Sequence, residues 1–219
     1  MKTRSLAIIA LLTCAALLAP VASADPIFTF GFTELAGSFD GTNTFDANVD
    51  ATTYGDVTRT FPTIGTARYD AGFALPADYS MTMTLSNITA TTADANGSFI
   101  ITDADGDTIT GDVTGHWTSV NIFSNFVGSL SNVVLNDNGA LDGTFDGPSG
   151  GSFDLAFPFV QDTFTGAIMT LETGAWFEAG TCWQDMNTLV QASVVPVPGA
   201  TLLGIVGLGI VAQIRRRLS

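Results

Sequence analysis

The chain has 219 residues and a formal net charge of −14, because 21 acidic residues outnumber seven lysines and arginines. All the acidic residues lie between residues 25 and 194, where the only basic residues are Arg59 and Arg68. That stretch of 170 residues therefore sets two positive charges against 21 negative ones, a formal charge of −19. Nucleic-acid binding needs a basic surface, so this composition argues against nucleic acid as a partner. The length suits one domain with its own core.

The first 24 residues have the pattern of a cleavable signal peptide. A basic start and an apolar run at residues 6–19 are followed by Ala22 and Ala24, the small residues of a cleavage site, and then by Asp25. This order is typical of export signals. We therefore predict a signal helix that is cleaved after Ala24, and a domain that lies outside the cytoplasm.

The exported domain, residues 25–194, shows strand patterns and no convincing helix pattern. The clearest strand is residues 79–85, where apolar side chains alternate with serine and threonine, as in a sheet with one face in water. A second strand is predicted at residues 151–159, and it should lie at an edge because Pro158 has no amide proton. Further strands are predicted at residues 27–33, 43–49, 66–71, 120–126, 129–135 and 164–171. The expected fold is all-β, a single sandwich or barrel-like domain.

A short phrase of glycine, serine or threonine, phenylalanine and aspartate recurs at residues 37–40, 143–146 and 151–154. Its spacing is irregular, so it does not indicate a solenoid of fixed period. We interpret each copy as the opening of a strand whose phenylalanine enters the core.

The acidic stretch at residues 101–112 has the strongest resemblance to a binding site. Asp103, Asp105 and Asp107 alternate in it and could supply oxygen ligands to calcium. The EF-hand calcium loop is not satisfied, because Thr108 stands where that loop requires glycine. The favoured alternative is a β-hairpin without metal, in which aspartate and glycine make the turn. No cofactor is expected unless these aspartates bind calcium.

The sequence offers little for catalysis. His116 is the only histidine, so any serine or cysteine hydrolase mechanism would have to use it. No nucleophile-elbow pattern is present, and a single histidine in a strand is more often structural. Cys182 is the one cysteine left once the signal peptide, with Cys14, is removed, and we expect it to be a small buried side chain. We predict a protein that is not an enzyme and has no catalytic residues.

Trp176 and Trp183 stand on either side of Glu178 and could form a platform on which a sugar stacks. The favoured alternative is that these aromatic residues close the core near the end of the domain.

The last 25 residues, 195–219, form a tail with three parts. It opens with Val195, Pro196, Pro198 and Gly199. The prolines hold this entry extended. The uncharged run 200–214 that follows is predicted to be a short transmembrane helix of roughly 22 Å. The tail ends with Arg215, Arg216 and Arg217, followed by two further residues. Such a cluster favours a cytoplasmic C-terminus.

This layout resembles the PEP-CTERM sorting domain of bacterial surface proteins, although Val197 stands where the motif carries glutamate. The resemblance covers the tail alone. It implies that an exosortase, a membrane protease that recognises such tails, is a partner and releases or transfers the exported protein. It also implies a place at the cell surface or in the extracellular polysaccharide of a biofilm. The alternative is a plain C-terminal membrane anchor.

Together these patterns predict an exported, surface- or matrix-associated protein that is not an enzyme and is sorted through its tail. The alternative is a carbohydrate- or calcium-binding module of the extracellular matrix, and a secreted hydrolase is less favoured.

Overall fold

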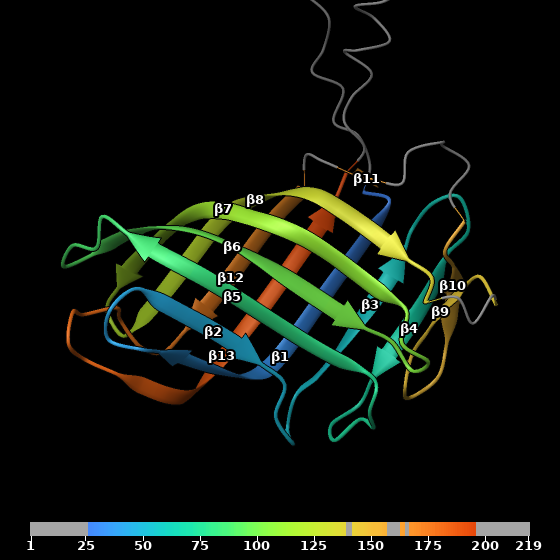
Figure 1. The fold of residues 1–219 in the computed structure, drawn as a ribbon, viewed down its shortest axis with the longest axis horizontal. Coiled ribbons are helices and arrows are strands. Elements are labelled where there is room, and N and C mark those ends of the chain that lie inside the picture. Colours follow the sequence, from blue (N-terminus) through green and yellow to red (C-terminus); the bar gives the residue numbers. More distant parts are fainter. Residues whose placement is uncertain (1–25, 139–141, 157–162, 165–166, 196–219) are drawn as a thin grey trace, which may run out of the picture. The chain divides into compact units, whose positions relative to one another are not determined.

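The computed structural model describes residues 26–138, 142–156, 163–164 and 167–195. These residues contain thirteen β-strands and no helix, which confirms the all-β prediction (Figure 1). The strands are β1 (Phe28–Phe39), β2 (Thr44–Asn48), β3 (Tyr54–Arg59), β4 (Gly65–Tyr69), β5 (Asp78–Ser86), β6 (Thr92–Thr102), β7 (Thr108–Val120), β8 (Phe123–Asn136), β9 (Thr144–Asp146), β10 (Ser152–Asp154), β11 (Thr163–Phe164), β12 (Ala167–Thr173) and β13 (Trp183–Val194). The predicted signal helix and transmembrane helix fall outside the described residues.

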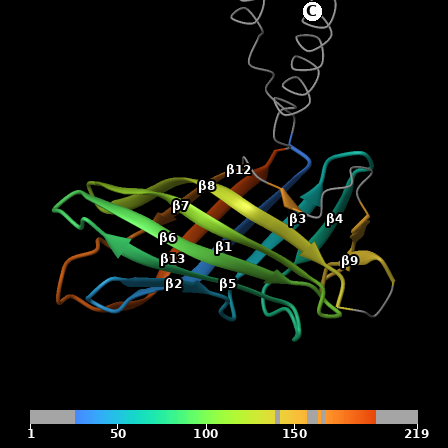
Figure 2. The ribbon, with the colours of Figure 1, turned by 45° about the horizontal axis from the view of Figure 1, so that its top comes forward.

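Eight of these strands close into a barrel. The antiparallel ladder runs β1, β2, β5, β6, β7, β8, β12, β13, and β13 pairs back onto β1. In Figures 1 and 2, strands β5 to β8 form one wall, and β12, β13 and β1 cross behind it. Closure pairs the edges of these eight strands with one another, which leaves fewer exposed edges that could recruit other chains. Of the two predicted architectures, the barrel is the one observed.

Strand β1 changes partners along its length. Residues from Phe28 to Thr33 pair with β3, whereas Ala36 to Phe39 pair with β2. The change occurs at Glu34, whose φ of 57° lies in the left-handed region, and the pairing with β13 shifts register there. This irregularity bends the strand, so β3 and β4 extend the sheet to one side of the barrel.

Alternating side chains fill the barrel interior. In β5, the predicted apolar residues Tyr79, Met81, Met83 and Leu85 are all buried. The ring of Tyr79 packs on Phe32 of β1, with 4.8 Å between centroids. Burial of such apolar surface is the main favourable term in folding, and here it leaves the centre of the barrel occupied by side chains.

Phe177 closes one end of the barrel. It comes from the loop between β12 and β13, is fully buried, and packs against Phe39 and Trp117 with centroid distances of 5.2 and 4.8 Å. The Trp183 indole N–H donates to the carbonyl of Trp176 in the same loop, at 3.1 Å. These contacts fix the loop over the core.

Two copies of the recurring phrase pair with each other near the β6–β7 turn. β9 and β10 form an antiparallel pair in which Phe145 lies opposite Phe153, and their rings stack at 5.2 Å. Every phenylalanine of the phrase is buried, as predicted, although Phe39 ends its strand instead of opening it. The strand predicted at residues 151–159 is short, since only Ser152–Asp154 is extended among its described residues.

One predicted boundary is wrong. The strand expected at residues 120–126 is interrupted by a turn at Asn121, whose φ of 58° lies in the left-handed region. Asparagine adopts this conformation more readily than most residues, and the turn joins β7 to β8.

Candidate functional site

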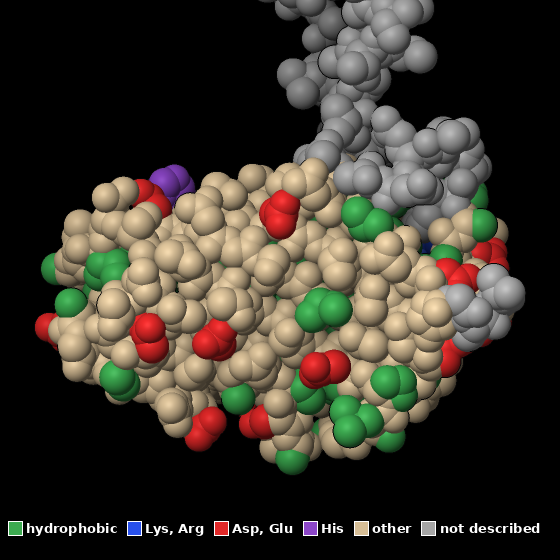
Figure 3. Space-filling model, viewed as in Figure 1, with side chains coloured by type: hydrophobic (Ala, Val, Ile, Leu, Met, Phe, Trp, Pro, Cys, Tyr) green, Lys and Arg blue, Asp and Glu red, His purple; other side chains and the backbone are tan. Residues whose placement is uncertain are grey.

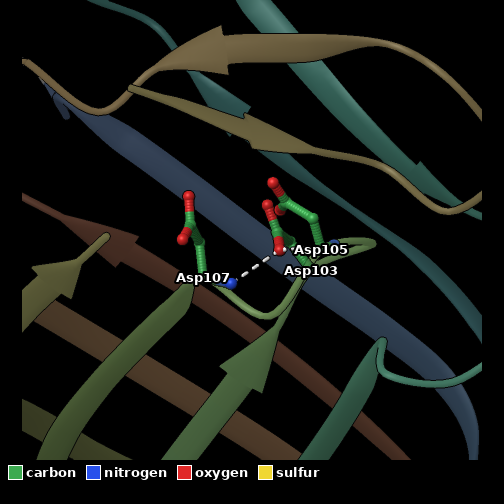
Figure 4. A group of neighbouring side chains, drawn as sticks. All are labelled: Asp103, Asp105 and Asp107. Carbon is green, nitrogen blue, oxygen red and sulfur yellow. Dashed lines mark hydrogen bonds between the residues drawn. The ribbon is translucent and has the colours of Figure 1, made fainter. Parts of the chain in front are cut away.

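The acidic turn joins β6 to β7, as the favoured hairpin prediction required. Asp103 organises it: its Oδ1 accepts the backbone N–H groups of Asp105 (3.1 Å), Gly106 (2.9 Å) and Asp107 (2.8 Å). Gly106 has a φ of 102°, which glycine adopts without strain. The three aspartates thus come from one tight turn, as Figure 4 shows.

Asp146 is brought to this turn by a second pair of hydrogen bonds. The N–H of Asp146 donates to Asp103 Oδ2 at 2.7 Å, and the N–H of Ala104 donates to the carbonyl of Asp146 at 2.9 Å. Strand β9 is therefore tied to the β6–β7 turn largely through one carboxylate.

Asp107 is the unusual member of the cluster. Its side chain is 1% exposed, and its Oδ1 accepts the N–H of Asn138 at 2.7 Å. Its Oδ2 is buried and has no hydrogen-bond partner among the residues that the structure describes. A buried polar atom without a partner is costly, and more so when it belongs to an ionised group.

The structure places five carboxylates in two overlapping groups. Oxygens of Asp103, Asp105 and Asp107 lie within 4.8 Å of one another, and so do oxygens of Asp105, Asp142 and Asp146. Asp105 belongs to both. Sequence reasoning missed Asp142 and Asp146, which lie far along the chain. The only available signal was the recurring phrase that ends at Asp146.

Burial and mutual repulsion disfavour ionisation in this cluster. Burial raises the pKa of Asp103 to about 7, although backbone N–H groups favour its ionised form. The pKa of Asp107 is also raised, first by burial and then by the negative charges of Asp105, Asp137 and Asp142. Burial therefore disfavours the charged forms of Asp103 and Asp107.

His116 lies on the outside of the barrel. Its side chain is 75% exposed, and its Nδ1 is 2.5 Å from Oδ1 of Asp94, its cross-strand neighbour on β6. Asp94 also accepts a hydrogen bond from Asn87. This is the arrangement of a cross-strand polar pair, which suits the structural role expected for this histidine.

Cys182 corrects one expectation. It was expected to be buried, but it is exposed, and its Sγ donates to the carbonyl of Asp40 at 2.9 Å. It lies in the loop before β13, on the outside of the core that Phe177 of the same loop enters.

Trp176 and Trp183 are half-buried, and their indole N–H groups donate to the carbonyls of Thr89 and Trp176. Trp183 packs on Phe177 with 5.6 Å between centroids, and Trp176 packs on it at 5.5 Å. These contacts favour the interpretation that the tryptophans close the core. The sugar platform at these two residues stays a prediction.

A different pair of aromatic side chains is open to solvent. Tyr54 and Phe123 are 51% and 46% exposed and line one hollow with Glu34, Glu172 and Asn187. This hollow was not predicted, because its residues come from five separate segments.

The predicted signal and sorting residues fall outside the described part of the chain, except for Val195. They are Ala22, Ala24, Asp25, Pro196, Pro198, Gly199, Arg215, Arg216 and Arg217. Among the residues that are described, no helix is long and apolar enough to cross a membrane.

Comparison with known proteins finds no family model, no curated protein and no solved structure that matches this chain. Any functional conclusion therefore depends on the residues of the chain itself.

Proposed function

We propose that this chain is an exported protein of the cell surface or extracellular matrix that is not an enzyme and is sorted through residues 195–219. The observation that carries the proposal is the export pattern at residues 1–24 combined with the three-part tail at the other end. An exosortase-type protease is the partner that recognises and processes the tail. The membrane holds the protein only until that protease acts.

The strand pairing and surface of the domain between these signals support a location outside the cytoplasm. Its strand edges are largely paired by closure, and on the face in Figure 3 acidic side chains are scattered among backbone and side chains that are neither charged nor hydrophobic. Like charges keep such a surface soluble and discourage self-association. The barrel core is filled by side chains, and His116 is engaged by Asp94 on the outer face. These features favour a binding or structural role over catalysis.

Substitution of the basic cluster in the native host tests the sorting step. Combined Arg215→Gln, Arg216→Gln and Arg217→Gln should leave the exported protein unprocessed and reduce the surface or released fraction at least ~10-fold, because the cytoplasmic anchor charge is lost. Arg68→Gln, which removes a positive charge from the domain, should leave sorting unchanged. Wild-type surface delivery of the triple variant would overturn the proposal.

The exposed aromatic pair favours a second candidate, a carbohydrate-binding module. The faces of Tyr54 and Phe123 suit apolar sugar faces, and the nearby Glu34, Glu172 and Asn187 offer hydrogen-bonding groups. A glycan-binding screen should find a ligand whose binding is lost in Tyr54→Ala and Phe123→Ala but kept in Trp176→Ala. Loss in the tryptophan variant alone would place the sugar at the other aromatic cluster, and no binding at all would remove this candidate.

A further inference from the structure

We propose that the cluster formed by the β6–β7 turn and the start of β9 is a calcium site centred on Asp105, whose carboxylate lies within 4.8 Å of oxygens of Asp103 and Asp107 in one group and of Asp142 and Asp146 in the other. Asp103 positions these groups. The site requires only the folded domain, so it stands or falls independently of the sorting route proposed above.

The strongest indication is the buried Oδ2 of Asp107. The carboxylate is almost completely removed from water, and one oxygen has a hydrogen-bond donor while the other has none in the described part of the chain. A bound cation would give that oxygen a partner and would offset the cost of burying the charge. Oxygens of Asp103 and Asp105 lie within 4.8 Å, on the side of the turn to which all three side chains point (Figure 4).

The backbone around the cluster is already fixed. Three N–H groups of the turn converge on Asp103 Oδ1, and Asp146 is held against the turn by its own N–H and carbonyl. The backbone that carries the ligands therefore needs little reorganisation, which lowers the entropic cost of binding an ion. The ion would bridge β9 to the barrel.

The carboxylate ligands of the cluster favour calcium over other metal ions. Every side chain of the cluster offers carboxylate oxygen, which suits a hard cation and not zinc or copper. Calcium tolerates irregular geometry with six to eight oxygens, whereas magnesium demands a near-ideal octahedron. The irregular arrangement of two overlapping groups fits calcium better.

Protein cations are scarce in the domain, which has only two arginines and no lysine. The Arg59 guanidinium donates to the carbonyls of Phe61, Asp154 and Ala156. A cation from solution would therefore add positive charge that the sequence supplies only sparingly.

Calcium titration of the full chain, purified in detergent and treated with a chelator, tests the site. At ~10 mM calcium chloride the melting temperature should rise by roughly 3–10 °C, as expected for a dissociation constant of 0.1–1 mM in a domain of this size. Magnesium at equal concentration should produce less than half this shift. No shift and no binding heat with calcium would overturn the proposal.

Asp107→Asn separates binding from folding. The asparagine keeps an oxygen for the N–H of Asn138 and removes the buried charge, so the variant should melt at or above the wild-type temperature in chelator. Its affinity for calcium, and that of Asp142→Asn, should fall at least ~10-fold, while Asp56→Asn, which removes an equal charge on β3, should bind as wild type. Unchanged affinity in the two cluster variants, or an equal loss in Asp56→Asn, would contradict a specific site.

Discussion

Asp103 is the residue that joins two parts of the molecule. It is fully buried and accepts four backbone N–H groups, three from its own turn and one from Asp146 of β9. Without its carboxylate, these donors would lose their partner in a place that water reaches poorly. These four donors offset part of the cost that burial imposes on the charged form of Asp103.

Asp103→Ala should lower the free energy of unfolding by roughly 2–5 kcal/mol, because several buried N–H groups lose their acceptor. Asp103→Asn should cost less, since its oxygen still serves the turn while its amide opposes the N–H of Asp146. Urea denaturation measures both changes. Equal stability of the alanine variant and wild type would contradict this role.

The pH dependence of stability follows from the same group. The folded state holds a proton on Asp103 up to about pH 7, whereas an unfolded aspartate releases it near 3.8. Because the folded state binds more protons between these values, stability in calcium-free buffer should fall as the pH rises from about 4 to about 7. The pKa values of Asp40, Asp50 and Asp94 are lowered, so their contributions are lost only below that window. Urea denaturation at several pH values measures the free energy of unfolding. A rise in that free energy between about pH 4 and about pH 7 would contradict this prediction.

Single residues show what a sequence can predict of a site. The three aspartates of the turn are recognisable because they are close in the chain. Asp142 and Asp146 come close to them only in the folded structure, and no local sequence pattern predicts that proximity. The burial of Asp107 Oδ2 likewise cannot be predicted without the packing around it.

The strands that were predicted are those with one wet and one buried face, such as β5. β3 was not predicted, because an aromatic side chain faces water in it and a charged one is buried. Tyr54 is 51% exposed, whereas Arg59 is buried. β13 turns Thr188 and Ala192 inward, so its apolar alternation is weak. Tertiary contacts override the local pattern in both strands.

Close packing between strands predicts a strong effect at Gly97 of β6. A Cβ at this position would lie 2.0 Å from the carbonyl oxygen of Thr82 and 2.7 Å from Cα of Met83, so the β5–β6 pair would have to separate. Gly97→Ala should therefore cost roughly 2–4 kcal/mol.

Gly31→Ala is the matched control on β1, because its Cβ would find ordinary contacts, the nearest at 3.6 Å. It should change stability by less than about 1 kcal/mol. Thermal melting compares the two variants, and equal melting temperatures would show that the β5–β6 packing is looser than described.

The whole molecule combines a closed barrel with a strongly acidic composition. Closure depends on the pairing of β1 with β13, strands that begin more than 150 residues apart in the chain. Strand patterns alone could predict the all-β class but could not choose between a sandwich and a barrel. The net charge, in contrast, follows directly from the sequence, and it favours a domain that stays soluble through self-repulsion.

Mass spectrometry of the mature protein from its own host directly tests export and sorting through the tail. We expect a chain that begins at Asp25 and ends between Val195 and Pro198, because both the signal peptide and the sorting tail are removed. A mature chain that still ends at Ser219 would contradict sorting by a tail-reading protease, and a chain that still begins at Met1 would contradict export.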